Sequence, residues 1–65
     1  MNELKVLSHI NKELAEQWKT NTTFLADGGA KSYDEYRHIC GVIRGLAQAE
    51  SLIKDLVQRL ERNDD

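Results

Sequence analysis

The chain has 65 residues, of which nine are Lys or Arg and eleven are Asp or Glu, giving a formal net charge of −2. This size allows one domain at most, residues 1–65, and such short chains usually need disulfides, metal ions or association with other chains to be stable. The single cysteine, Cys40, excludes an intrachain disulfide, and no set of His, Cys, Asp and Glu has the spacing of a zinc site. Association with protein is therefore the expected source of stability.

The near balance of charges does not favour nucleic acid or a membrane surface as the partner. No apolar run approaches the roughly 20 residues that cross a bilayer, and the first residues lack the basic start and unbroken apolar stretch of a secretory signal. An unpaired cysteine suits a reducing compartment, so we expect a cytoplasmic protein.

The first half of the chain predicts a helix over residues 2–19 followed by a loop over residues 20–31. Apolar residues recur at spacings of three and four along one face, at Leu4, Leu7, Ile10, Leu14 and Trp18. Asn2 is suited to cap the start of this helix. After residue 19, the run Asn21-Thr22-Thr23 and the pair Gly28-Gly29 favour a turn over a continued helix.

The second half predicts a long helix over residues 32–62. Ser32 and Glu35 match a capping box, in which the serine hydroxyl and the glutamate carboxylate accept hydrogen bonds from free backbone N–H groups. Apolar residues then follow a heptad pattern, at Ile39, Val42, Leu46, Ala49, Ile53, Leu56 and Leu60. Together the two segments predict an all-α antiparallel helical hairpin, with a short first and a long second helix, that forms part of an oligomeric bundle.

The unequal helix lengths predict a surface for a partner. A first helix of about 27 Å would reach back along the second helix only to Glu50. The apolar residues beyond that point would be left uncovered, namely Leu52, Ile53, Leu56, Val57 and Leu60. Exposing each of these large side chains would forgo about 1.5–3 kcal/mol. We therefore expect another chain to cover this cluster.

Gly41, Gly45 and Ala49 form a row of small residues four positions apart. Glycine costs up to about 1 kcal/mol per helix position relative to alanine, so two glycines in one helix need a reason. Close approach by the first helix or by a partner helix supplies that reason, with Trp18 or Phe24 as the side chain that fills the groove. Glu50 is either a rim residue or a polar residue that sets the register of a partner.

The sequence has no catalytic signature. Cys40 has no activating residues around it and is expected to be a small packing residue. His9 and Glu13 are read as a pair on the helix surface, because a metal ion needs three or four ligands that converge. We expect no catalytic site, no metal site and no cofactor, and hence no enzyme.

The stretch KSYDEYRHICGVIRGLAQAESLIKDLVQRLE, with its capping box, paired glycines and long terminal helix, resembles small helical proteins encoded by tailed bacteriophages. The resemblance covers residues 31–61. It implies a virion component, an assembly factor or an inhibitor directed at the host, and it brings no functional residues with it.

The leading hypothesis is a non-enzymatic protein-interaction module, present in several copies as a structural or assembly component of a phage-type particle. It would act as a homo-oligomer or docked on a larger assembly, in the host cytoplasm or in the virion. Two alternatives stay open. One is a small regulator that binds a host protein, and the other is an RNA-binding four-helix bundle similar to Rop.

Overall fold

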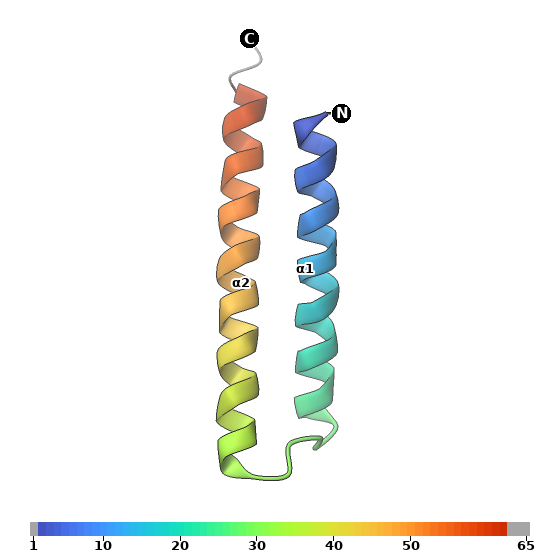
Figure 1. Ribbon diagram of the computed structural model, residues 1–65, viewed down its shortest axis with the longest axis vertical. Helices are drawn as coiled ribbons and strands as arrows, with labels where there is room; N and C mark the ends of the chain where they lie inside the picture. Colours follow the sequence, from blue (N-terminus) through green and yellow to red (C-terminus); the bar gives the residue numbers. More distant parts are fainter. Residues whose placement is uncertain (1, 63–65) are drawn as a thin grey trace.

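The computed structural model describes residues 2–62 as a hairpin of two helices. Helix α1 spans Glu3–Ala26 and helix α2 spans Tyr33–Arg62, with the loop 27–32 between them. The helices run antiparallel, so the loop closes one end, and the start of α1 and the end of α2 lie at the other (Figure 1). The described residues contain no strand. The predicted all-α hairpin is therefore confirmed, with 24 residues in α1 and 30 in α2.

The predicted caps begin both helices. The Asn2 side chain accepts a hydrogen bond from the Leu4 backbone N–H at 2.8 Å. At the start of α2, the Ser32 hydroxyl accepts from the Glu35 N–H at 3.1 Å, and the Glu35 carboxylate accepts from the Lys31 N–H at 2.6 Å. These bonds satisfy backbone donors that have no partner inside the helix.

The predicted end of the first helix at residue 19 is wrong, because α1 continues to Ala26. The polar side chains expected to end the helix instead donate hydrogen bonds to carbonyls in the preceding turn. Thr20 bonds Glu16 at 3.0 Å, Asn21 bonds Gln17 at 2.8 Å, and Thr22 bonds Lys19 at 3.0 Å. Since their polar groups are satisfied within the helix, these residues do not need a turn, and the loop shrinks from 20–31 to 27–32.

The turn occurs at the predicted glycine pair. Gly28 has a φ of 77°, the left-handed conformation that glycine adopts without strain. The Gly29 N–H donates to the Phe24 carbonyl at 2.8 Å and the Gly28 N–H donates to the Leu25 carbonyl at 3.0 Å. These two bonds form a Schellman motif, which ends α1. The Phe24 ring lies against Gly29, where an added Cβ would stand, so Phe24 packs on the loop.

The two helices face each other along a seam with seven-residue periodicity. We define the seam as Leu4, Leu7, Asn11, Leu14, Trp18, Asn21 and Leu25 of α1 with Ile39, Ile43, Leu46, Glu50, Ile53, Val57 and Leu60 of α2. All of these except Trp18 are half-buried. The predicted heptad used Val42, Ala49 and Leu56 where the seam uses Ile43, Glu50 and Val57. The apolar face of α2 is wide enough for either set, and only packing against α1 decides between them.

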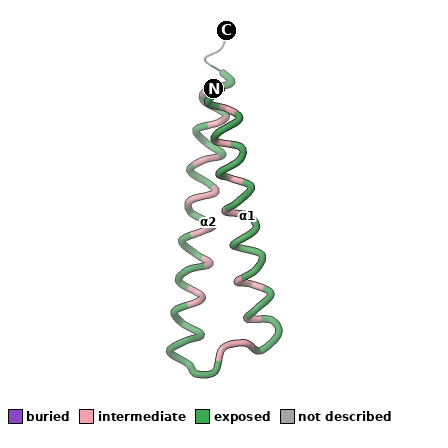
Figure 2. The backbone as a smooth tube through the Cα atoms, turned by 45° about the vertical axis from the view of Figure 1, so that its right-hand side comes forward, coloured by how far each residue is buried: buried purple, intermediate pink, exposed green. Residues whose placement is uncertain are grey.

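The hairpin encloses no core of its own. It extends 51 × 16 × 15 Å, and the two shorter dimensions are those expected for a single pair of helices side by side. No residue within 2–62 is fully buried, and the seam residues are only partly shielded (Figure 2). Apolar side chains therefore remain in contact with water even where the helices touch.

Candidate protein-interaction surface

The hairpin has two different sides, which follow from the seam. In either helix, the residue that immediately precedes a seam residue is rotated from it by about 100° around the helix axis. The direction of this rotation is the same in both helices when each is viewed from its own N-terminus. Because the helices are antiparallel, these preceding residues of α1 and α2 project from the same side of the hairpin. A groove of 370 Å³ on this side, lined by residues of both helices, confirms the arrangement; its lining residues are Glu3, Val6, Leu7, Leu56 and Leu60.

Large apolar side chains project from this side of the hairpin. We call it the apolar side and define it by five residues with these exposed fractions: Val6 39%, Ile10 40%, Val42 37%, Leu52 71% and Leu56 41%. Gly45 and Ala49 also immediately precede seam residues, so they lie in the same row of α2 between Val42 and Leu52. The apolar side thus combines small residues near the middle of α2 with large ones on either side of them.

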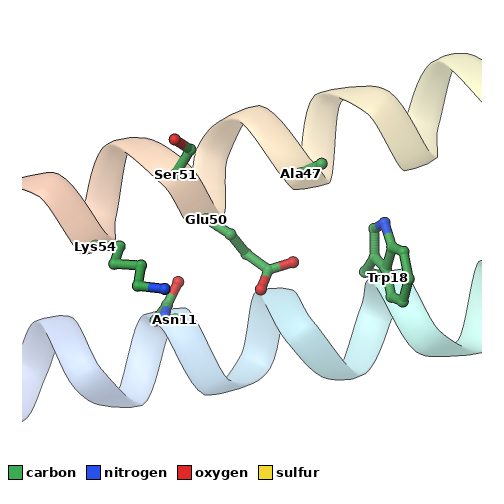
Figure 3. A pocket seen from close by; sticks show the side chains of 6 residues that line it. All are labelled: Asn11, Trp18, Ala47, Glu50, Ser51 and Lys54. Atoms are coloured by element: carbon green, nitrogen blue, oxygen red, sulfur yellow. The ribbon is translucent and has the colours of Figure 1, made fainter.

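The opposite side of the hairpin is polar. The residues that immediately follow seam residues include Lys5, Lys12, Lys19, Arg44, Ser51 and Lys54, all of them exposed. A second groove, of 540 Å³, opens on this side and is lined by Asn11, Trp18, Ala47, Glu50, Ser51 and Lys54 (Figure 3). Its lining contains no histidine or cysteine. Glu50 and Lys54 extend from α2 toward α1, and Trp18 extends from α1 toward α2.

Two polar residues interrupt the seam at this second groove. Glu50 is half-buried, and its carboxylate lies between the two helices (Figure 3). Asn11 is also half-buried, and its Oδ1 atom has no hydrogen-bond partner among the described residues. The structure therefore places Glu50 inside the hairpin, where it faces α1 and not the apolar side.

The structure divides the cluster that sequence predicted as a partner surface. The expectation that the first helix reaches back only to Glu50 is wrong, because α1 is longer and Val6 and Leu7 share a groove with Leu56 and Leu60. Ile53, Val57 and Leu60 are half-buried in the seam. Leu52 and Leu56 lie on the apolar side and remain exposed. The sequence placed Ile10 on the packing face of the first helix, but Asn11 takes that place in the seam and Ile10 is exposed. Val6 and Ile10 were not predicted as partner-surface residues; each immediately precedes a seam residue.

The glycine row does not pack against α1. A Cβ added at Gly41 or Gly45 would meet no side chain and no part of α1 within 4 Å in the described part of the chain. Close approach by the first helix, with Trp18 or Phe24 in the groove, is therefore wrong: Phe24 lies on Gly29, and Trp18 lines the second groove, on the polar side. The alternative, packing by a helix from a partner, stays a prediction for Gly41, Gly45 and Ala49.

The remaining reactive groups have local structural contacts. Cys40 is half-buried, and its proximity to Tyr36 one turn earlier in α2 raises the pKa of Tyr36 above its ordinary value. Within residues 2–62, no three or more His, Cys, Asp or Glu side chains gather where they would hold a metal ion. Neither described helix combines the length and apolar character needed to cross a membrane.

No protein-family model matches the chain, and no curated protein or solved structure is similar to it at a significant level. The resemblance to small phage proteins therefore stays a prediction that rests on the helix pattern of residues 31–61.

Proposed function

We propose that the protein is a non-enzymatic protein-interaction module that binds another protein through its apolar side. One observation carries this proposal: five large apolar side chains from two helices share one side of a hairpin that has no fully buried residue among 2–62. Large apolar side chains exposed on one side of a small protein are typical of a binding surface. The polar side carries lysines and an arginine and is suited to face water.

The energetics couple binding to folding. Covering the exposed part of each of these five side chains would contribute roughly 1 kcal/mol per residue, which sums to the order of 5 kcal/mol. This equals the lower end of the stability of a typical folded domain, about 5 kcal/mol. A partner that binds only the folded hairpin would therefore supply a large share of its stability.

A chain that reaches full stability only when covered is suited to permanent incorporation in an assembly. We therefore extend the proposal to a structural or assembly component that is present in several copies. The resemblance of residues 31–61 to small phage proteins supports a phage-type particle as that assembly, with the chain in the host cytoplasm before incorporation.

The test compares two double variants in the cells that make the protein. Leu52→Gln with Leu56→Gln removes two large residues from the apolar side, and Ser51→Gln with Lys54→Gln changes the polar side by the same number of residues. Size fractionation and native mass spectrometry should find the wild type and the polar-side variant in a complex. The amount of complex formed by the apolar-side variant should be at least ten-fold lower than that of the wild type. A wild-type chain that remains folded and monomeric at 7.4 kDa in these cells would overturn the proposal.

A further inference from the structure

We infer that the partner on the apolar side is a second copy of this chain, and that α2 crosses the α2 helix of that copy in antiparallel orientation at Ala49. The two hairpins then form a four-helix bundle related by a two-fold axis. This inference rests on the proposed function, since it names the protein that the apolar side binds.

The exposed area of the hairpin is large enough for a standard dimer interface. A compact monomer of 7.4 kDa would expose about 4,200 Å², whereas this chain exposes 5281 Å². The excess of about 1,100 Å² exceeds the roughly 800 Å² that each partner buries in a standard stable interface. A second hairpin of the same length can cover the apolar side along its whole length, because the two surfaces are identical and a two-fold axis pairs them.

The order of residues along α2 is complementary to itself when reversed. Val42, Gly45, Ala49, Leu52 and Leu56 follow one another at spacings of three and four. With the axis beside Ala49, Leu52 stands opposite the partner's Gly45 and Val42 stands opposite the partner's Leu56. The open space at Gly45, where an added Cβ would meet nothing within 4 Å, then receives a leucine. Leu52 then meets a small residue, which favours interdigitated packing, and Val42 and Leu56 form an apolar contact on either side of it.

The same axis brings α1 onto the partner's α1. Trp18 and Ala47 line one groove, so the position level with Ala49 lies near Glu16 of α1. Val6 and Phe24 lie on either side of that level and are 39% and 44% exposed. An antiparallel crossing there brings Val6 toward the partner's Phe24. Both helices of each hairpin therefore contribute apolar contacts, and the lysine-bearing side of each hairpin stays outward.

Cysteine cross-linking tests the arrangement directly. In a Cys40→Ala background, Ala49→Cys should form disulfide-linked dimers under mild oxidation, because the axis brings the two Ala49 positions together. The matched control, Val42→Cys, should not cross-link to itself, because its two copies would lie roughly 20 Å apart, well beyond disulfide reach. Adding Leu56→Cys to Val42→Cys should restore the cross-link. Circular dichroism would check that each variant keeps the wild-type helix content.

Sedimentation of the purified wild-type chain completes the test, with a dimer expected at micromolar concentration. A folded monomer across the whole concentration range would overturn the inference. A disulfide between two Val42→Cys chains would also overturn it, and so would an Ala49→Cys variant that sediments as a dimer but forms no disulfide. Failure of the proposed function looks different. If the chain is monomeric when pure but Leu52→Gln with Leu56→Gln still abolishes a complex with another protein in cells, only the second-copy inference is wrong. If neither association exists, both are wrong.

Discussion

Val6 of α1 and Leu56 of α2 line the same apolar groove, although they lie far apart in the sequence. Each immediately precedes a seam residue, Leu7 in one helix and Val57 in the other. This relationship joins exposed apolar residues of both helices in one groove near the open end of the hairpin. Adjacent residues therefore have different surroundings, one on the apolar side and the next in the seam. Substitutions at the two positions should affect partner binding and hairpin stability differently.

Replacing Asn11 by Leu should stabilise the hairpin. The Asn11 Oδ1 atom is buried in the seam without a hydrogen-bond partner among the described residues, and a leucine would remove that unfavourable burial and extend the apolar seam. We expect a gain of about 1–2 kcal/mol in the free energy of unfolding, measured by urea denaturation. Ser8→Leu, on the exposed polar side, is the control and should change stability little. A loss of stability in Asn11→Leu would show that the amide makes a bond that matters.

The two loop glycines should respond to alanine for different reasons. Gly28→Ala should cost about 1 kcal/mol, because alanine is strained at the φ of 77° found there. Gly29→Ala should also destabilise, because the added Cβ would stand where the Phe24 ring lies. In a Phe24→Leu background, thermal melts should show a smaller cost for Gly29→Ala and an unchanged cost for Gly28→Ala. An equal reduction at both glycines would contradict this separation.

Gly45→Leu separates helix propensity from association. In the isolated hairpin nothing lies within 4 Å of an added Cβ, so leucine should stabilise α2 by up to about 1 kcal/mol. In the proposed dimer the same change fills the space for the partner's Leu52, and overpacking should cost about 1–3 kcal/mol. The melting temperature of the wild type should rise over a hundred-fold range of protein concentration, whereas that of Gly45→Leu should not change. Equal or greater stability at every concentration would mean that Gly45 faces solvent in all states.

The influence of Cys40 on Tyr36 should be visible in a pH titration. Cys40 raises the pKa of Tyr36 above its ordinary value, because it favours the neutral hydroxyl. Any stability that it contributes is therefore fully present below the unfolded pKa and is lost as pH rises through the folded value. Ultraviolet titration of a Tyr33→Phe variant, in which Tyr36 is the sole tyrosine, should show the raised pKa. Adding Cys40→Ala should lower it, and an unchanged titration curve would show that the thiol is not responsible.

The sequence by itself determined that the protein is a helical hairpin. Periodic apolar residues, the caps at Asn2 and Ser32 and the turn at Gly28 are local signals, and the structure confirms each of them. Local signals failed at the end of α1. Thr20, Asn21 and Thr22 resemble a helix end by type, but their side chains bond carbonyls of the preceding turn and the helix continues.

Only the tertiary structure decided which apolar residues of α2 face α1. Val42, Ala49 and Leu56 fit a heptad as well as Ile43, Glu50 and Val57 do, because the apolar face of α2 is wider than one contact. Packing against α1 selected the second set, although it contains a glutamate. That choice left Leu52 and Leu56 on the same side as Val6, since equal rotations on antiparallel helices bring both apolar faces to one side of the hairpin.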